Sequence, residues 1–447
     1  MTATVGTDGS ERGTTAPTFR EALQVWLKIG LLSFGGPAGQ IALMHRMLVD
    51  EKKWIAEKPY LSALNFCMLL PGPEAMQLAT YVGWRLHGLK GGLTAGLLFV
   101  IPGALVVLTL SALYAAFGKL PLAEALFLGV KAAVLAVVVE ALMRIAKRGL
   151  KANADWMIAG AAFLGIYFLA LPYPVIVLAA ALVGYWRATG STSTDAVQAL
   201  PPPVPFAQTL TTVLIWLAIW ILPLLAIAAM FGRGHVLTEL SVFFSKLAVV
   251  TFGGAYAVLA YMTQDVVAHY KWLTHGEMLD GLGLAETTPG PLILVTEFVG
   301  FLAAFRHGGG SLGLGPWAMG VLGAMVTLWA TFVPCFLWIF AGAPYIERIN
   351  ANPRLKSALA AITSAVVGVI LSLTVWFALH VLFGRVATVK AGLLTFEAPQ
   401  LASLHPLALA LSILAFVLLL VMHRGVIVTL AVCGGLAVAA RLAGIIA

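Results

Sequence analysis

Charged residues are scarce in this chain. Of its 447 residues only 10% are charged, whereas 61% are hydrophobic, and the mean hydropathy is +0.96. A water-soluble domain has about 25% charged residues, so this composition excludes an ordinary soluble protein. Apolar stretches of roughly 20 residues recur along nearly the whole chain, a length typical of membrane-spanning helices rather than of barrel strands.

Cysteine is also rare, and the motifs of common enzymes are missing. The three cysteines, Cys67, Cys335 and Cys433, lie far apart in apolar segments. This spacing argues against a disulfide framework or a metal site and favours small buried side chains. The sequence has no Walker-type phosphate loop, no HExxH zinc motif and no plausible Ser-His-Asp order. We therefore expect no enzyme activity, no metal and no cofactor. The net charge of +8 comes from scattered basic residues and does not indicate nucleic-acid binding.

Apolar segments divide the chain into membrane and polar parts. In order they are 20–44, 60–86, 92–117, 121–146, 155–170, 173–187, 209–231, 238–262, 278–305, 316–341, 356–382, 404–421 and 425–444. Residues 1–18 lack the apolar core of a signal peptide and are predicted to be a disordered tail. The polar, proline-containing stretch 188–208 is predicted to be a linker. The remaining parts are a first membrane repeat at 19–187, a connecting transmembrane helix at 209–231 and a second membrane repeat at 232–447.

Three motifs occur twice at a constant spacing of 218 residues. Phe34-Gly35-Gly36 recurs as Phe252-Gly253-Gly254, Trp54 as Trp272, and Pro71-Gly72-Pro73 as Pro289-Gly290-Pro291. Lys28 and Lys246 fall into the same register. A duplicated apolar unit whose shared residues interrupt helices is typical of transporters built from two repeats.

The number of segments predicts how the two repeats are related. Six spans return the chain to the side where it began, and the seventh carries it across, so the second repeat begins on the opposite face. We therefore predict an all-α polytopic membrane protein with about thirteen transmembrane helices in two inverted-topology repeats, arranged six, one, six. If the second segment re-enters without crossing, the count per repeat becomes five. The Lys and Arg residues of the loops favour a cytoplasmic N-terminus and a periplasmic C-terminus.

The Pro-Gly-Pro motifs are predicted to interrupt their helices. Proline removes a backbone donor and clashes with the preceding turn, so neither motif fits inside a continuous helix. The unpaired backbone groups are tolerated in a membrane only inside the protein or beside a watery cavity. The free amides after Pro73, which belong to Glu74, Ala75 and Met76, would bind an anion together with the helix dipole. The amides after Pro291 would do the same in the second repeat. A proline kink with packing value alone is the alternative.

Hydroxyl and glycine residues flank these interruptions. In chain order they are Ser33, Gly35, Gly36, Thr251, Gly253, Gly254, Thr287 and Thr288, together with Phe34 and Phe252 of the two glycine motifs. Hydroxyls can donate to an oxyanion, and paired glycines let a ligand or another backbone come close. Helix packing through small residues is the alternative for the glycines.

Two lysines lie inside apolar segments, where a charge is expensive. Lys28 and Lys246 precede the glycine pairs by seven residues, about two helical turns, which places each lysine on nearly the same face as its glycines. One positive charge from each repeat, converging near the middle of the membrane, would suit a dianion. Snorkelling of the lysines to the membrane surface is the alternative.

Three glutamates near the Pro-Gly-Pro motifs, Glu74, Glu286 and Glu297, are candidates for proton coupling. A carboxylate repels an anion, so a carboxyl beside an anion site makes sense if it is protonated when the anion is bound. For Glu74 the alternative is a carboxylate favoured by the helix dipole. Glu140 and Arg144 are spaced i, i+4 and are interpreted as a structural pair, with Lys131 as a further partner.

Together these motifs resemble the chromate transporter (CHR) superfamily in its long, two-domain form. The resemblance covers residues 20–445 and rests on Phe34-Gly35-Gly36-Pro37, Glu51 to Trp54, Leu70-Pro71-Gly72-Pro73-Glu74, Gln77 and Tyr81-Val82-Gly83, then on Phe252-Gly253-Gly254-Ala255-Tyr256, Lys271-Trp272, Ala285 to Pro291 and Phe298 to Phe301. The second unit departs from the first where Ala255 replaces Pro37, Leu292 replaces Glu74 and Val295 replaces Gln77. The two halves should therefore contribute different groups to one site.

The resemblance implies a bacterial inner-membrane protein that exports chromate at the expense of the proton gradient, with sulfate as the natural competitor. We predict a proton-coupled secondary transporter that works by alternating access. One oxyanion site would form near the membrane centre from the two broken helices. Its partners would be chromate or sulfate dianions, protons and lipid, and a homodimer stays open. The alternatives are a sulfate or other oxyanion carrier, a passive channel, and a chromate-reducing membrane enzyme, which would need a redox centre.

Overall fold

The computed structural model describes residues 17–34, 36–188, 205–252, 255–309, 313–346, 352–392 and 394–445. Of the tail expected at 1–18, all but Pro17 and Thr18 lies outside the described residues. The same holds for most of the linker expected at 188–208. Gly35, Gly253 and Gly254 of the glycine motifs are also not described.

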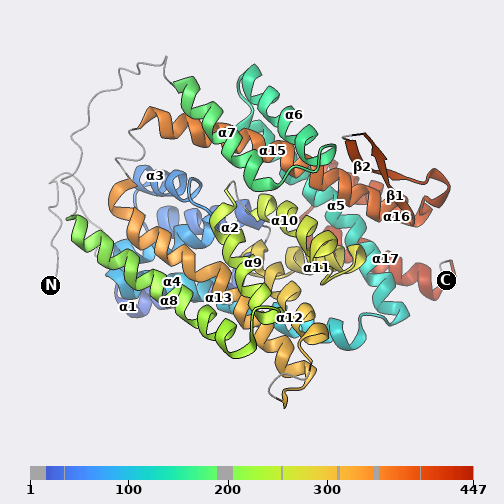
Figure 1. Ribbon diagram of the computed structural model, residues 1–447, viewed down its shortest axis with the longest axis horizontal. Helices are drawn as coiled ribbons and strands as arrows, with labels where there is room; N and C mark the ends of the chain where they lie inside the picture. The colour runs from blue at the N-terminus through green and yellow to red at the C-terminus, as the bar shows by residue number, and fades with distance from the viewer. Residues whose placement is uncertain are drawn as a thin grey trace.

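Helices make up most of the described chain (Figure 1). The first half contains α1 (Phe19–Leu32), α2 (Gly36–His45), α3 (Glu57–Cys67), α4 (Glu74–Phe117), α5 (Pro121–Gly149), α6 (Asn153–Tyr167) and α7 (Tyr173–Arg187). The connecting helix is α8 (Phe206–Phe231). The second half contains α9 (Val236–Val250), α10 (Ala255–Gln264), α11 (His275–Thr287), α12 (Val295–His307), α13 (Pro316–Gly342), α15 (Pro353–Leu382), the strands β1 (Val386–Ala391) and β2 (Leu394–Pro399), α16 (Pro406–Phe416) and α17 (Val426–Leu442).

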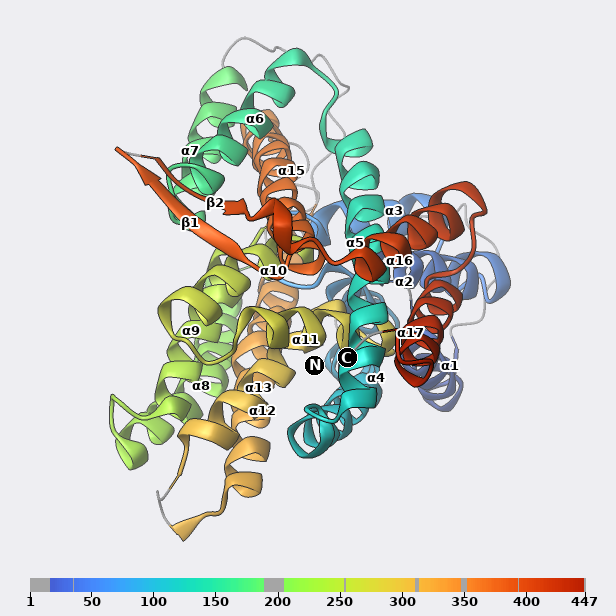
Figure 2. The same ribbon diagram turned by 90° about the vertical axis from the view of Figure 1, so that its right-hand side faces the viewer.

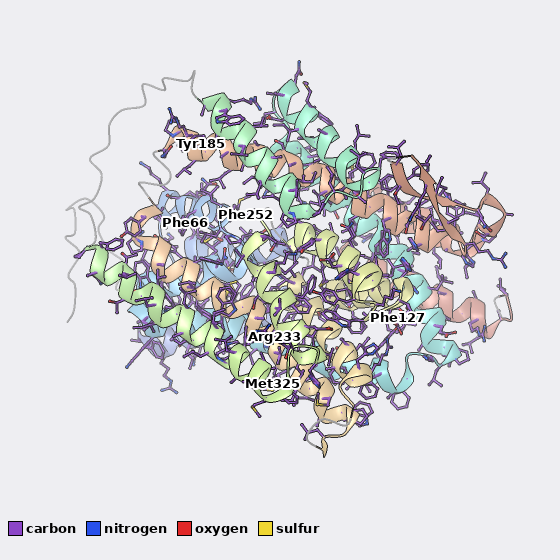
Figure 3. The ribbon with its side chains drawn as sticks, viewed as in Figure 1. Phe66, Phe127, Tyr185, Arg233, Phe252 and Met325 are labelled. Carbon is purple, nitrogen blue, oxygen red and sulfur yellow. The ribbon has the colours of Figure 1, made fainter. Side chains whose placement is uncertain are left out.

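Several helices are built to lie in a membrane. Within the described ranges, α4, α5, α8, α13 with its following turn, and α15 are long and apolar enough to cross one. Their outward side chains include large apolar groups such as Met325 on α13, which is 60% exposed (Figure 3). An apolar outer surface of this extent suits contact with lipid rather than water. The chain is therefore a multi-pass membrane protein.

Several segments expected to be single helices are divided in two. Residues 20–44 form α1 and α2, which separate after Leu32, and residues 238–262 form α9 and α10, which separate after Val250. The Pro-Gly-Pro motifs separate α3 from α4 and α11 from α12, as the prolines predict. The breaks at the glycine motifs were not predicted. They leave α1 with 14 residues and α2 with 10, each short of the roughly 20 that a spanning helix needs.

Helix α4 consists of two limbs that fold back on one another. The backbone leaves helical geometry at His87 and Gly88, where Gly88 has a positive φ of 61°. A Cβ at Gly83 would collide with the carbonyl of Gly91, so the limbs touch directly beyond the turn. The turn agrees with the gap expected between segments 60–86 and 92–117. In the second half, α12 and α13 form the corresponding pair and pack closely.

Local structure repeats at the same 218-residue spacing as the sequence. The amides of Trp54 and Trp272 donate to carbonyls six residues earlier, at 2.8 and 3.0 Å. Lys53 and Lys271, one residue before each tryptophan, have positive φ angles of 53° and 55°. Both sites follow a π-helical turn. The duplication seen in the sequence is therefore also a duplication of backbone geometry.

The two halves interlock through their C-terminal helices (Figure 2). Helix α5 of the first half packs against α16 and α17 of the second, while α15 of the second half packs against α6 and α7 of the first. Gly129 lets α5 approach the Cys433 carbonyl of α17, and Gly184 lets α7 approach the Ser357 carbonyl of α15. At the end of α7, Arg354 lies over the ring of Tyr185, with 5.4 Å to the centroid (Figure 3). The three cysteines are free and buried, as expected.

The antiparallel hairpin of β1 and β2 lies between α15 and α16 and was not predicted. Val386 pairs with Pro399 and Ala391 with Leu394. The amide of Thr395 donates to the Phe168 carbonyl at 2.7 Å, and the Tyr167 hydroxyl donates to the Glu397 carbonyl at 2.9 Å. These bonds fix the hairpin to the end of α6 (Figure 2).

Candidate functional site

Each Pro-Gly-Pro interruption binds the broken helix of the opposite half. The Gly72 amide donates to the Thr251 carbonyl at 3.1 Å, and the Gly290 amide donates to the Ser33 carbonyl at 2.9 Å. Donors and acceptors are both related by the 218-residue spacing, so the contact occurs twice in equivalent form. Gly72 and Gly290 have φ angles of 107° and 90°, which residues with a side chain rarely adopt.

The hydroxyl groups near the interruptions bind carbonyls of their own helices. Ser33 donates to the carbonyl four residues earlier at 2.6 Å, and Thr251 does the same at 2.5 Å. Thr287 and Thr288 donate to carbonyls three residues earlier, at 2.8 and 3.1 Å. These hydroxyls therefore satisfy the ends of α1, α9 and α11, and their lone pairs rather than their protons face any neighbour.

Two glutamines satisfy the carbonyls of the interruptions. The Gln40 amide donates to the Gly290 carbonyl at 2.6 Å, and the Gln77 amide donates to the Pro71 carbonyl at 2.7 Å. Both glutamines are buried. An unpaired buried carbonyl would be unfavourable, so these side chains help to hold both breaks in place.

A cavity of about 120 Å³ lies where the first half's breaks meet the second half. Gly36, Pro37 and Glu74 line it from the first half, and Tyr256 lines it from α10. Arg144 and Arg148 enter from the C-terminal end of α5, four residues apart and so on one face of the helix. The cavity is therefore lined by two arginines beside the start of a helix, of which Arg148 is exposed.

The charged groups around the cavity are only partly paired. Arg144 forms an ion pair with Glu140 on its own helix, which confirms the interpretation of that spacing. No ion pair of Arg148 occurs within the part of the chain that the structure describes. The Tyr256 hydroxyl donates to the Glu286 carboxylate at 2.9 Å in a buried setting. Guanidinium groups bind tetrahedral oxyanions well because they offer several donors in a fixed plane.

The three candidate glutamates lie in different surroundings. Glu74 lines the cavity, and its Oε2 atom is buried with no hydrogen-bond partner among the described residues. Glu286 is held by Tyr256 behind the cavity wall. Glu297 is 1% exposed and has a buried, unpartnered Oε2, but it does not line the cavity. Of the three, only Glu74 lines the cavity.

The two candidate lysines do not reach the cavity. Lys28 is exposed on the outer face of α1. Lys246 is exposed on α9, with its ammonium 5.7 Å from the centroid of the Tyr261 ring. The predicted shared face requires the helix to continue from lysine to glycine, but α1 ends at Leu32 and α9 ends at Val250. The break changes the direction of the chain, so helical phase does not carry over it.

The remaining predicted residues hold the breaks together rather than line the cavity. Pro71, Gly72, Pro73, Ala75, Gly290 and Pro291 are buried, and Phe34, Phe252 and Pro289 are half-buried. The Phe252 carbonyl accepts from the Tyr173 hydroxyl at 2.9 Å (Figure 3 labels Phe252). The amides after Pro73 begin α4 directly, whereas those after Pro291 first form a 3₁₀ turn, Leu292–Leu294.

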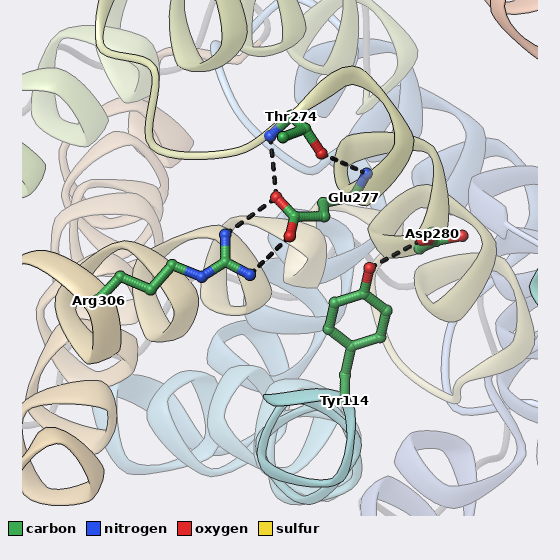
Figure 4. Close-up of polar contacts among 5 residues, drawn as sticks. All are labelled: Tyr114, Thr274, Glu277, Asp280 and Arg306. Atoms are coloured by element: carbon green, nitrogen blue, oxygen red, sulfur yellow. Dashed lines mark hydrogen bonds and ion pairs between the residues drawn. The ribbon is translucent and has the colours of Figure 1, made fainter. Parts of the chain in front are cut away.

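A second polar cluster joins α11 to α4 and α12 (Figure 4) and also to α5. Tyr114 donates to Asp280 at 2.8 Å, and Lys131 pairs with Asp280 at 3.0 Å. Arg306 grips both carboxylate oxygens of Glu277, at 2.9 and 2.6 Å. Lys131 therefore pairs with Asp280 of α11, whereas Glu140 pairs with Arg144. None of these residues lines the cavity.

The sequence interpretation did not include the cavity arginines among the candidate site residues. Arg144 was interpreted only as the partner of Glu140, and Arg148 was not singled out, because both lie near the end of an apolar helix. Their i, i+4 spacing on one face was the available signal. Nothing in the local sequence placed that face against Glu74 and Tyr256, which lie far away along the chain.

Comparisons with known proteins agree with the two-part sequence pattern. The profile of the family described as chromate transporter matches residues 20–185 and 238–439. A chromate transport protein of Pseudomonas aeruginosa is 32% identical over 401 residues, 88% of this chain and 89% of that protein. A chromate transport protein of Cupriavidus metallidurans is 30% identical over 80% of this chain and 82% of its own. A probable chromate transport protein of Synechococcus elongatus is 30% identical over 79% of this chain and 83% of its own. No solved structure matches the chain significantly.

Proposed function

We propose that this chain, which belongs to the chromate transporter family, is a transport protein that carries the chromate dianion across the bacterial inner membrane. One observation supports the proposal above all others. Two arginines, one of them without an ion-pair partner in the described ranges, meet at a cavity between the broken helices of the two halves.

The cavity offers a dianion both charge and hydrogen bonds. Arg144 and Arg148 would supply two positive charges. The Tyr256 hydroxyl already donates its proton to Glu286, so it would not donate to the anion. The start of α4 adds amides and the positive end of a helix dipole. Arg144 is already paired with Glu140, so the anion would have to compete with that carboxylate. Sulfate has the same charge and shape and would enter the same cavity.

Proton coupling would operate through Glu74. Its carboxyl lines the cavity, where a carboxylate and a dianion repel one another. Protonation would remove the repulsion, so loading of the anion and of the proton would be linked. Glu286 would be a second relay, because it is hydrogen-bonded to Tyr256 on the cavity wall. Ligands that load together move in the same direction, so this linkage would drive chromate the way the protons flow. Export on an inward proton gradient would instead need chromate and the proton to load alternately.

Alternating access would come from movement between the two halves. The paired contacts of Gly72 and Gly290 with the opposite half support a two-fold relation between the repeats. A single connecting helix, α8, would carry the chain across the membrane once between the repeats, as inverted topology requires. The N-terminus would then lie in the cytoplasm and the C-terminus in the periplasm. The cavity would then open to one side or the other as the halves rock.

Transport into proteoliposomes tests the proposal. Purified protein is reconstituted, and uptake of labelled chromate is measured for the wild type, Arg144→Gln and Arg148→Gln. Loss of one charge-assisted hydrogen bond costs about 1.5–3 kcal/mol, so we expect the chromate KM to rise roughly 10- to 100-fold. Arg148→Gln is the cleaner variant because it breaks no ion pair of the described structure.

Lys147→Gln is the matched control. Lys147 neighbours Arg148 on α5 but does not line the cavity, so its uptake should match the wild type. Chromate KM values equal to the wild-type value in Arg144→Gln and Arg148→Gln, as in the Lys147→Gln control, would refute the arginine site. Uptake that never exceeds the outside concentration, even with a pH gradient, would indicate a passive channel. Stronger inhibition by sulfate than by unlabelled chromate would make sulfate the preferred substrate.

A further inference from the structure

Two histidines and a glutamate meet outside the cavity described above. His275 begins α11, His380 lies near the end of α15, and Glu397 lies in β2. One possible ligand atom from each lies within 4.8 Å of the other two. His275 and Glu397 also line a separate cavity of about 290 Å³ between α10, α15 and the hairpin. The three residues come from segments that are distant in sequence.

His380 is oriented as a metal-binding imidazole usually is. Its Nδ1 atom lies 2.9 Å from the Trp376 carbonyl, and because a carbonyl only accepts, Nδ1 carries the proton. Nε2 is therefore left with its lone pair. Metal-bound histidines generally donate their other N–H to a carbonyl or carboxylate in this way. The His380 ring stacks on His275, with centroids 4.4 Å apart and 6° between the planes.

Glu397 presents a carboxylate oxygen without a donor. Its Oε2 atom is buried and has no hydrogen-bond partner among the described residues, and its nearest ion-pairing group is His380 Nδ1 at 3.7 Å. The strand is fixed, because the Glu397 carbonyl accepts from Tyr167. A buried oxygen held in place without a donor is one that a cation would satisfy.

We propose that His275, His380 and Glu397 bind a divalent transition-metal ion of the Zn²⁺ type. Two imidazoles and one carboxylate are a common ligand set for zinc, with water in the fourth position. Ligand atoms at 2.0–2.1 Å from zinc are about 3.4 Å apart in a tetrahedron. The ligand atoms must therefore close by up to about 1.4 Å, and the stacked rings must separate. The His380 ring must also turn, because Nδ1 rather than Nε2 now faces Glu397. His275 is exposed at the first position of its helix, so its side chain would make most of that movement by leaving its stack on His380.

The bound ion would join three separate parts of the second half. It would tie the start of α11 to the end of α15 and to the hairpin. Helix α11 runs from His275 to Thr287, directly before the second Pro-Gly-Pro interruption. The ion would thus restrain a helix that leads to the interruption, and it should stabilise the folded protein by binding the native arrangement only. The site does not depend on the proposed transport of chromate.

Metal titration of the full chain tests the site. Protein purified without a histidine tag is treated with a chelator and then titrated with Zn²⁺ by calorimetry and with Co²⁺ by visible absorption. We expect one saturable site per chain and a rise in Tm with Zn²⁺. His380→Ala and Glu397→Gln should each weaken binding roughly tenfold or more and abolish the Tm rise.

His423→Asn is the control, because His423 lies in an exposed loop with a positive φ of 51° that asparagine tolerates. It should bind Zn²⁺ like the wild type. If His380→Ala does not fold, Glu397→Gln at the hairpin decides alone. The proposal is overturned if no saturable binding occurs below millimolar Zn²⁺, or if both ligand variants bind normally. It is also overturned if the variants change only how Tm depends on pH and leave Zn²⁺ binding unchanged, since the cluster would then bind a proton rather than a metal.

Discussion

At the first interruption Glu74 follows Pro73, and at the second Leu292 takes the same place after Pro291. The same contrast extends to the long helices that interlock the halves. Helix α5 carries Glu140, Arg144 and other charges along its length, whereas α15 has no Asp, Glu, Lys or Arg between residues 357 and 382. The backbone geometry is thus duplicated, but the charges of the cavity come mainly from one copy.

This difference separates what the duplication provides from what later divergence provides. The equivalent bonds of Gly72 and Gly290 to the opposite half require the same geometry twice. The cavity needs charge only once, because both halves meet at it. A symmetric frame with an asymmetric site predicts that backbone changes have equal effects in the two halves and that side-chain changes do not.

Gly72→Ala and Gly290→Ala should lower the stability of the protein to a similar degree, and this should be the largest effect. Each glycine has a positive φ, and strain of this kind costs about 1–3 kcal/mol. A Cβ would also press on Cys335 at 3.1 Å in one case and on Leu294 at 3.0 Å in the other. Size-exclusion profiles and Tm of the purified variants measure the loss. A harmless change at one position beside a severe one at the other would contradict the symmetric frame.

Gly160→Ala is the matched control for these variants. Gly160 lies inside α6, and a Cβ there would meet nothing within 4 Å. Alanine is favoured over glycine in a helix by about 1 kcal/mol, so this variant should be as stable as the wild type or slightly more so.

Glu74→Gln should remove proton coupling, while Glu297→Gln in the second half should keep it. Both carboxyl groups have a buried oxygen without a partner, but only Glu74 lines the cavity. With the membrane potential clamped at zero, a one-unit pH gradient is worth about 1.4 kcal/mol, or a tenfold chromate gradient, per coupled proton. Chromate accumulation in proteoliposomes should fall to equilibrium in Glu74→Gln.

The opposite result, in which Glu297→Gln loses accumulation and Glu74→Gln keeps it, would move the proton site to the second half. Loss in both variants would indicate a relay that passes through both glutamates. Either result would break the asymmetry of the site without affecting the symmetric backbone.

The sequence alone predicted the interruptions but not how they are joined. Pro71 and Pro73 force a local break whatever surrounds them, and the 218-residue spacing places a second break without further information. The bond from Gly72 to Thr251 joins residues that are far apart along the chain, and no local pattern encodes it. Arg148 could not be assigned to the cavity for the same reason, because the cavity joins residues that are far apart along the chain.

Lys28 illustrates a different failure of prediction. Its predicted position relied on helical periodicity continuing to Gly35, but α1 ends at Leu32. Periodicity is informative only within one unbroken helix. The hairpin of β1 and β2 was missed although Val386–Ala391 is rich in β-branched residues, because its short strands lie beside long apolar segments that dominate the sequence signal.

The clamp between Glu277 and Arg306 exists in the second half only, since Pro59 and Gly88 occupy the equivalent positions of the first. Glu277 lies before the span expected at 278–305. Burial raises the pKa of Glu277, but hydrogen bonds from Arg306 and Thr274 outweigh it and leave the pKa below its ordinary value. The clamp should therefore contribute stability above about pH 4.3, the pKa of glutamate in the unfolded chain, and lose it as the pH falls through the folded pKa.

Glu277→Gln should lower the free energy of unfolding by about 1 kcal/mol at pH 7, given partial exposure, and should have no effect in strong acid. Glu51→Gln in the first half is the control, because the exposed Glu51 carboxylate lies 3.6 Å from Arg46. It should leave Tm unchanged at both pH values. An equal loss of Tm in both variants would mean that general surface charge, and not the clamp, stabilises the second half.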